Sequence, residues 1–333
     1  MKPKLICVGQ TFLNGPSPHH IPLFQQYFDI GSYDPLQTYS KEHTFLYAHE
    51  DHYKKIARYK KTGCKFIAEA LWELKFMCDD NFDNQTIGLI NNTDHRRRTI
   101  SVPKWFWFEE HHSQSNNKPV SPLPYNYPKK KTFLMQINYA RKERLLLWER
   151  LKERNLLKDS LHSFLAKGYG LEGPIINYDP SKTLVLHPWN YPFSQRNYVA
   201  DWYNQTVFTL IVEYSYRQHH NKINPVFITE KTFKPIMYGH PFLLYGSTHS
   251  LKKLKDWGFE TYNNWFDESY DDITDLHKKI EHICNVIAQP TREYDDNTIE
   301  KINHNVKQFW DRKLVNQLMV NEIIIPILNF INS

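Results

Sequence analysis

Short, uninterrupted apolar runs alternate along the chain with polar stretches that carry apolar residues at helical spacing. Runs of four to eight apolar residues bounded by turn residues are typical of strands buried on both faces of a parallel sheet. Such runs predict strands at 4–8, 45–48, 64–68, 86–90, 99–102, 132–137, 206–213, 242–245 and 259–262. The helical spacing predicts helices at 52–61, 141–155, 229–238 and 250–257, and one or two between 299 and 331 with a kink near Pro326. This alternation favours an α/β fold with parallel sheets covered by helices.

A cluster of four prolines, Pro119, Pro122, Pro124 and Pro128, interrupts the pattern near the middle of the chain. Proline fixes φ and cannot donate a backbone hydrogen bond, so this stretch should be an extended linker. The length of 333 residues also fits two domains of ordinary size. We therefore expect an N-terminal α/β domain at 1–118, a linker at 119–131, a second α/β domain at 132–305, and a terminal helix at 306–333 that packs back toward the first domain.

Composition indicates a folded protein but does not define its ligand. Apolar residues make up 41% of the chain and aromatic residues 15%, which excludes wholesale disorder. The net charge of +6 allows an anionic ligand but does not demand a nucleic-acid groove. The four dispersed cysteines predict reduced thiols. Because the N-terminal apolar run is too short for a signal peptide and no long apolar window follows, we expect a cytoplasmic protein without a membrane span.

The window with the richest chemistry spans residues 225–242. Thr229 is a plausible helix N-cap, which would place Glu230 and Lys231 in the first turn of the helix, where backbone N–H groups have no partner within the helix. A phosphate could bind there beside the ammonium of Lys231, while the carboxylate of Glu230 could accept bonds from sugar hydroxyls. The alternative is that Glu230 complements the helix dipole and Lys231 is solvated. Pro235 predicts that this helix is short or kinked.

Several segments of the second half resemble the donor-binding motif of the family 10 α-1,3-fucosyltransferases. The segments are V-E-Y-S at 212–215, F-I-T-E-K-T-F-K-P-I at 227–236, G-H-P-F at 239–242 and Y-G at 245–246. They are still more similar to a group of viral and bacterial glycosyltransferase-like proteins that carry T-E-K-T-[FW]-K-P, and the resemblance covers about residues 130–280. It implies a B-type glycosyltransferase fold, in which two Rossmann-like domains face each other across a cleft and the C-terminal domain holds the donor.

The resemblance also implies a set of donor-binding residues. Glu230 would contact donor hydroxyls, Lys231 the diphosphate, and Arg141, or else Arg144, would assist the phosphates. The full expected set is Thr229, Glu230, Lys231, Arg141, Arg144, Glu213, Ser215 and Phe227. Fucosyltransferases usually carry Tyr where this chain has Phe227, so one hydroxyl contact is missing and the sugar need not be fucose.

The catalytic base is the least visible part of the reaction. An inverting sugar transfer needs a carboxylate or histidine that takes the proton of the acceptor hydroxyl, and we expect it from the first domain. The candidates are Glu109 and Glu110 after the aromatic run 105–108, Glu50, Asp51 and Glu69 after strand candidates, and His19 and His20 in the first loop. Each of them could instead be an ordinary surface residue.

The sequence supports neither a metal site nor another cofactor. The histidine pairs lack zinc-ligand spacing, and no D-x-D triplet occurs, so we expect a metal-independent transfer. The expected partners are a nucleotide sugar and a glycan or other hydroxyl acceptor. One alternative is a DNA glycosyltransferase that acts on hydroxymethylated bases, with phosphate contacts from 96–98 and 129–131. Another is a non-catalytic nucleotide-sugar or glycan-binding protein. A viral enzyme would work in the host cytoplasm.

Overall fold

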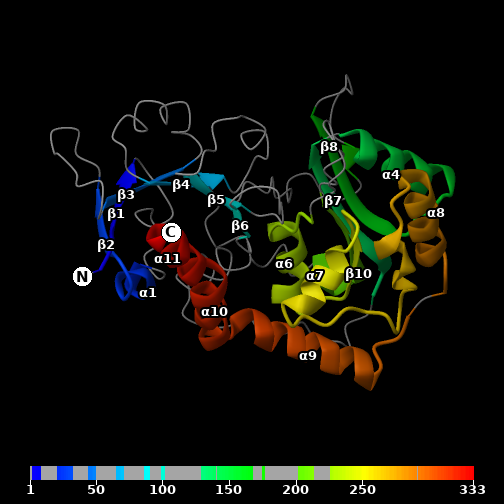
Figure 1. The fold of residues 1–333 in the computed structure, drawn as a ribbon. Coiled ribbons are helices and arrows are strands. Elements are labelled where there is room, and N and C mark those ends of the chain that lie inside the picture. Colours follow the sequence, from blue (N-terminus) through cyan, green and yellow to red (C-terminus); the bar gives the residue numbers. More distant parts are fainter. Residues whose placement is uncertain are drawn as a thin grey trace. The chain divides into compact units, whose positions relative to one another are not determined.

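The fold is a mixed α/β architecture with parallel sheets (Figure 1). The computed structural model describes residues 2–8, 21–32, 44–49, 65–70, 86–90, 99–101, 129–139, 141–167, 175–176, 202–213, 226–290 and 292–333. The chain divides into two compact units. Unit 1 comprises Met1–Gln114 together with Asp311–Ser333, and unit 2 comprises Ser115–Trp310. Each unit contains a sheet of its own.

The sheet of unit 1 has six strands in the order β2-β1-β3-β4-β5-β6, and every pairing between them is parallel. Its elements are β1 (Lys4–Val8), α1 (Ile21–Gln25), β2 (Asp29–Ser32), β3 (Thr44–His49), β4 (Lys65–Ala70), β5 (Thr86–Ile90) and β6 (Thr99–Ser101). Five of these strands follow apolar runs of the sequence, and those five predictions are confirmed. The helix expected at 52–61 lies outside the described residues.

The C-terminal residues complete unit 1 with α10 (Arg312–Met319), a π-helical turn (Val320–Ile324) and α11 (Ile325–Asn332). Pro326 has no N–H to donate to the carbonyl four residues earlier, and the π turn lies directly before it. The predicted irregularity near Pro326 is thus confirmed. The Nζ of Lys65 in β4 donates to Phe330 O at 3.0 Å and to Ile331 O at 2.9 Å. This ammonium satisfies carbonyls at the negative end of α11 and ties the helix to the sheet.

The stretch Arg312–Asn332 is long and apolar enough to cross a membrane when judged by length and composition. The same property is found in core helices of folded domains, and one such helix is weak evidence for a span. Seven apolar residues of this stretch are buried in the protein: Val315, Met319, Ile323, Ile324, Ile327, Phe330 and Ile331. Ile325 is the one large hydrophobic residue in the described part of the chain that is exposed, at 43%. Packing within the protein therefore buries part of the apolar surface of this stretch.

The sheet of unit 2 has the order β11-β10-β7-β8-β9, in which all pairings are parallel except that of β8 with β9. Its strands are β7 (Lys131–Tyr139), β8 (Ser160–Lys167), β9 (Ile175–Ile176), β10 (Thr206–Val212) and β11 (Phe242–Tyr245). Its helices are α4 (Lys142–Glu153), α6 (Glu230–Met237), α7 (Ser250–Asp256), a 3-10 turn η5 (Glu268–Asp272), α8 (Leu276–Ile287) and α9 (Asp296–Trp310).

Helices cover both faces of the unit 2 sheet, with α4 and α8 on one side and α6 and α7 on the other (Figure 1). Every residue of β10 is buried, as expected for a central parallel strand. On the α6 side, the Phe233 ring packs against the rings of Trp257, Phe259 and Phe309 at centroid distances of 6.2, 5.9 and 6.4 Å. The aromatic residue of the T-E-K-T-F segment is therefore a core residue that holds α6 in place.

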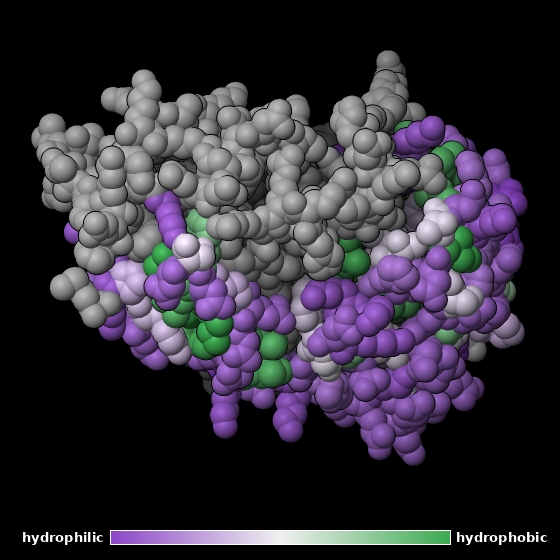
Figure 2. All heavy atoms as spheres, in the orientation of Figure 1, coloured by the Kyte–Doolittle hydropathy of each residue, from purple (hydrophilic) through white to green (hydrophobic). Residues whose placement is uncertain are grey.

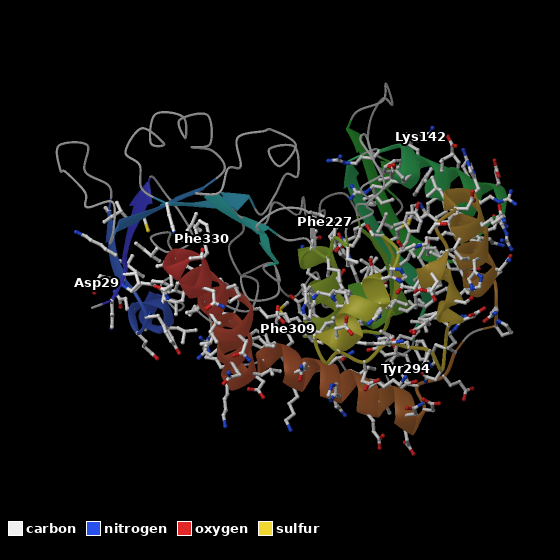
Figure 3. All side chains as sticks on the ribbon, in the orientation of Figure 1. Asp29, Lys142, Phe227, Tyr294, Phe309 and Phe330 are labelled. Atoms are coloured by element: carbon white, nitrogen blue, oxygen red, sulfur yellow. The ribbon has the colours of Figure 1, made fainter. Side chains whose placement is uncertain are left out.

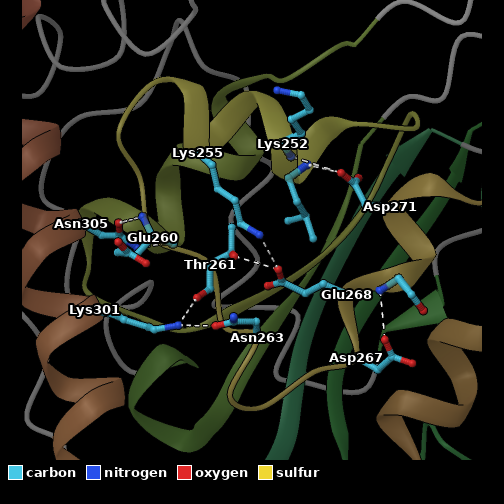
Figure 4. Close-up of polar contacts among 12 residues, drawn as sticks. Lys252, Lys255, Glu260, Thr261, Asn263, Asp267, Glu268, Asp271, Lys301 and Asn305 are labelled. Atoms are coloured by element: carbon cyan, nitrogen blue, oxygen red, sulfur yellow. Dashed lines mark hydrogen bonds and ion pairs between the residues drawn. The ribbon is translucent and has the colours of Figure 1, made fainter.

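The strand predicted at Phe259–Tyr262 is wrong, because this segment has no strand partner. Its apolar residues are buried, which is the signal that suggested a strand. The backbone of Glu260 bonds instead to one side chain of α9: its N–H donates to Asn305 Oδ1 at 2.8 Å, and its carbonyl accepts from Asn305 Nδ2 at 2.9 Å (Figure 4). An asparagine thus satisfies the donor and acceptor that a neighbouring strand would otherwise satisfy.

Unit 2 includes all of α9 and ends at Trp310, and the C-terminal part of unit 1 begins at Asp311. The expected domain boundaries stay predictions. Most of the expected linker, 119–128, lies outside the described residues. On the face shown in Figure 2 the described surface is mainly hydrophilic, with small separate hydrophobic areas.

Gly258→Ala should destabilise unit 2 by about 1–2 kcal/mol. Gly258 follows α7 at φ +84°, and an added Cβ would lie 2.5 Å from Nε2 of Gln308, which donates to Trp257 O. The loss of stability has two sources, the strain of alanine at a positive φ and the close contact with Gln308. Urea unfolding of the variant, alone and combined with Gln308→Ala, separates them. In the Gln308→Ala background the contact is relieved, so only the backbone strain should remain. Equal stability of the variant and the wild type would contradict this expectation.

Candidate functional site

The carboxyl ends of β10 and β11 form the base of the candidate site. Glu213 directly follows β10, and its backbone N–H donates to Tyr245 O at the end of β11 at 2.9 Å. The side chain of Glu213 is buried, at 1% exposure. Its Oε1 accepts from Thr229 N at 2.7 Å and from Thr232 Oγ1 at 2.8 Å, and its Oε2 accepts from Thr229 Oγ1 at 2.8 Å. One buried carboxylate thereby fastens the start of α6 to the end of a central strand.

Thr229 is the N-cap of α6, as the sequence predicts, and has the extended backbone that caps require. Its Oγ1 accepts from Lys231 N at 3.4 Å and from Lys231 Nζ at 3.1 Å. The ammonium of Lys231 therefore lies beside the N-terminus of α6, where the helix carries a partial positive charge. Helix α6 ends at Met237, and the prediction that Pro235 keeps it short is confirmed.

The start of α4 lies at the same edge of the sheet. Arg141 occupies the N-cap position of α4 and is exposed, whereas Arg144 in the first turn is buried. The hydroxyl of Tyr245, the last residue of β11, donates to Glu143 O at 3.2 Å. Two arginines are thus held close to the carboxyl ends of the parallel strands, which is the edge where ligands bind in open α/β sheets.

Figure 3 shows this arrangement within unit 2. Lys142, the first residue of α4, lies toward the upper edge of the unit in that view, and Phe227, which precedes α6, lies lower. Tyr294, whose hydroxyl donates to Val207 O near the start of β10 at 2.6 Å, lies toward the opposite edge (Figure 3). Glu213, after β10, binds the start of α6, and Tyr245, at the end of β11, binds the start of α4, so both helix starts lie at the carboxyl edge of the sheet.

The N-terminus of α7, in contrast, is already occupied by a carboxylate. Asp271 Oδ2 accepts from Leu251 N at 3.1 Å and from Lys252 N at 3.2 Å (Figure 4). Burial raises the pKa of Asp271. Burial also lowers the pKa of Lys279 to about 8, and this lysine donates to Gly246 O at 3.3 Å. These residues fix the loop that follows β11, so they position the edge of the site.

A polar network holds the segment between α7 and η5 (Figure 4). Glu268 Oε2 accepts from Lys255 Nζ and from Thr261 Oγ1, each at 2.9 Å. Lys301 of α9 donates to Thr261 O at 2.8 Å and to Asn263 Oδ1 at 2.5 Å. The segment 266–271 is thus part of the scaffold of unit 2.

The structure brings three of the expected donor-binding residues into one hydrogen-bonded group: Glu213, Thr229 and Lys231. Glu230 is the first residue of α6, but its side chain is outside the described part of the chain, and Phe227 lies two residues before the N-cap. Of the base candidates, Glu69 belongs to β4 by its backbone, and its side chain is not described. Ser215, Glu109, Glu110, His19, His20, Glu50 and Asp51 lie outside the described residues.

Sequence reasoning did not single out the residues that build the scaffold of the site. These are Thr232, Tyr245, Asp271 and Lys279. Lys279 carried a usable signal, because it falls on the apolar side of α8 between Leu276 and Ile280. The roles of the other three depend on partners 19 to 102 positions away along the chain, which no local pattern reveals. Within the described residues, no group of three or more His, Cys, Asp or Glu side chains could hold a metal ion.

Comparisons with known proteins give a distant structural likeness. No family model matches the chain, and no curated protein matches it. Among solved structures, it is similar to an α1,3-fucosyltransferase crystallised with GDP, at 12% sequence identity and a TM-score of 0.43. The match covers 95% of this chain and 92% of that chain. Because identity and TM-score are this low, the roles of individual residues have to come from the chain's own contacts.

Proposed function

We propose that the protein is a glycosyltransferase that moves a sugar from a nucleoside-diphosphate donor to a hydroxyl acceptor. The observation that carries the proposal is the ammonium of Lys231, held 3.1 Å from the N-cap hydroxyl of Thr229 at the carboxyl edge of a parallel sheet. A lysine beside a helix N-terminus at this edge is suited to bind a phosphate. Thr229 and Lys231 also belong to the T-E-K-T-F-K-P segment, which resembles the donor-binding motif of the family 10 α-1,3-fucosyltransferases.

In this proposal the donor diphosphate binds at the start of α6. Lys231 and backbone N–H groups of the first turn contact the phosphates, and Arg141 or Arg144 adds a second cation from the start of α4. Glu230 accepts hydrogen bonds from hydroxyls of the donor. Negative charge develops on the diphosphate as the bond to the sugar breaks, and the same cations stabilise it in the transition state.

The remaining chemistry is a proton transfer from the acceptor. A base takes the proton of the acceptor hydroxyl while its oxygen attacks the sugar carbon from the side opposite the diphosphate, which inverts that carbon. Glu109, Glu110, Glu69 and His19 stay the proposed candidates for the base. The two-domain arrangement facing across a cleft and the cytoplasmic location likewise stay predictions.

A thermal-shift screen with a panel of nucleotide sugars tests the proposal. A ligand that binds only the folded state raises the melting temperature, by an amount that grows with ligand concentration. We expect a nucleotide sugar and its nucleoside diphosphate to stabilise the protein, and the matching nucleoside to have little effect. If no nucleoside diphosphate or nucleotide sugar stabilises or binds the protein, the proposed function is wrong. Stabilisation without transfer to any acceptor would favour the non-catalytic binding protein.

Sugar transfer should survive EDTA. The proposed site stabilises the departing diphosphate with lysine, arginine and helix N–H groups, so no divalent cation is required. The measurement is the initial rate before and after dialysis against EDTA. Complete loss of activity that Mg²⁺ or Mn²⁺ restores would overturn the metal-independent mechanism.

We favour a glycan or small hydroxyl acceptor over DNA, and duplex binding at two salt concentrations tests this choice. Two lysines of the basic run 129–131 are engaged at the amino edge of the unit 2 sheet: Lys129 donates to Tyr203 O at 3.3 Å, and Lys131 donates to Lys158 O at 3.1 Å. We expect weak duplex binding. Sub-micromolar binding that collapses at the higher salt concentration would show phosphate contacts and favour the DNA alternative.

A further inference from the structure

We infer that Thr229 and Glu213 are positioning residues that orient the ammonium of Lys231, and that neither contacts the donor. This inference rests on the proposed function and assigns a different role to two residues of the expected donor-binding set. The observation behind it is a continuous chain of hydrogen bonds from the Glu213 carboxylate through the Thr229 hydroxyl to Lys231 Nζ.

The direction of each bond in this chain follows from the chemistry of its members. A threonine hydroxyl has one hydrogen to donate and two lone pairs that accept. The two carboxylate oxygens of Glu213, at 2.9 and 2.8 Å, can only accept, so they take the hydrogen of Thr229. The lone pairs of Thr229 Oγ1 are then directed to its other two neighbours, Lys231 N and Lys231 Nζ. Glu213 therefore sets the orientation of the hydroxyl, and the hydroxyl sets the position of the ammonium.

Burial supports the positioning role. Glu213 and Thr229 are both buried, and the carboxylate already accepts from the backbone N–H and hydroxyl of Thr229 and from the hydroxyl of Thr232. Lys231, in contrast, is half-buried and carries the charge that attracts a phosphate. Its flexible stem loses conformational freedom when it binds a ligand, and an ammonium that is anchored beforehand loses less.

The experiment is a double-mutant cycle on nucleotide affinity in the full-length protein. The probes are ADP, CDP, GDP and UDP. The affinity of the nucleotide that binds the wild type most tightly is then measured for every variant by calorimetric titration. Thr229→Val removes the hydroxyl and keeps the shape of the side chain, and Lys231→Met removes the amine and keeps the stem. We expect Thr229→Val to weaken binding about 3- to 10-fold. In the Lys231→Met background the same change should have no further effect, because no ammonium is left to orient.

Two control variants separate positioning from general support of the helix. Thr232→Val removes a hydroxyl that donates to the same carboxylate, so it should lower the melting temperature and leave affinity nearly unchanged. Thr229→Ser keeps the hydroxyl and should restore wild-type affinity. If Thr229→Val does not fold, Glu213→Gln provides the same comparison with and without Lys231→Met.

The outcomes distinguish the inference from the function on which it depends. If Thr229→Val weakens binding by the same factor with and without the Lys231 amine, Thr229 acts independently of Lys231 and the positioning role is wrong, while the proposed function stands. If Thr232→Val weakens binding as strongly as Thr229→Val, the hydrogen bonds of Glu213, Thr229 and Thr232 only stabilise the start of α6, and the positioning role is wrong. If the wild-type protein binds none of the four diphosphates, the proposed function fails and the inference fails with it.

Discussion

Lys231→Ala should weaken binding of the nucleotide-sugar donor by about 1.5–3 kcal/mol, which is roughly 10- to 150-fold in Kd. The ammonium of Lys231 lies beside the N-terminus of α6, and under the proposed function its removal deletes one charge-assisted hydrogen bond to a phosphate. Calorimetric titration with the donor identified in the thermal-shift screen measures the loss directly.

The matched control for this prediction is Lys234→Ala on the same helix. Lys234 lies one turn further from the N-terminus of α6 and is also half-buried. Its substitution by alanine therefore removes the same charge and the same aliphatic side-chain atoms from the same helix. Its effect on donor affinity should be small, because the influence of a helix end is confined to the first turn. Unchanged donor affinity in a folded Lys231→Ala protein would refute the proposed placement of the diphosphate.

Acid should destabilise the protein below pH 6.5, with His240 as one of the causes. His240 is buried: its Nε2–H donates to Thr206 O at 2.9 Å, and its Nδ1 accepts from Thr209 Oγ1 at 2.9 Å. Burial lowers the pKa of His240 to about 3, against 6.5 for the ordinary side chain. Between these values the unfolded chain binds a proton that the folded protein does not. The stability is therefore complete above pH 6.5 and falls by about 1.4 kcal/mol per pH unit as pH drops toward 3.

Denaturant unfolding at several pH values, in the wild type and in His240→Gln, tests this expectation. The variant should be less stable at neutral pH, and its free energy of unfolding should change with pH by about one proton less between pH 6.5 and 4. Thr209→Val is the control, because it removes a hydrogen bond to His240 but keeps the titrating ring. Identical pH slopes for the wild type and His240→Gln would show that this histidine does not contribute.

Helices and strands are predicted best from the sequence where the local pattern of apolar and capping residues agrees with the packing of distant segments. The apolar runs at β10 and β11 form strands whose residues are all buried, and Thr229 is a cap because the residue type suits the end of a helix. The run at Phe259–Tyr262 has the same local signal, but Asn305, from a helix 45 positions later, bonds its backbone instead. Helix α8 was not predicted, although its cap Asp275 and its apolar spacing are typical of a helix, because the buried Lys279 weakens that pattern.

The candidate site shows the same division between local and distant information. The motif at 229–232 identifies Lys231, and the resemblance adds Glu213. No local pattern reveals that the Glu213 carboxylate binds both threonines of that motif from 16 and 19 positions away, or that Tyr245 holds the first turn of α4. These contacts are made only when parallel strands bring their carboxyl ends together, so they follow from the topology of the sheet.

The discontinuous composition of unit 1 has a consequence for folding during synthesis. Its sheet is translated first, but α10 and α11, which belong to it, come after all of unit 2. At about 5–20 residues per second, the ribosome needs roughly 10–40 s to pass from Gln114 to Asp311. Throughout that interval Lys65 lacks the carbonyls of Phe330 and Ile331 that it binds in the finished protein. Unit 2 is contiguous and can fold first, which makes the nascent N-terminal sheet the part of this protein that we expect chaperones to protect.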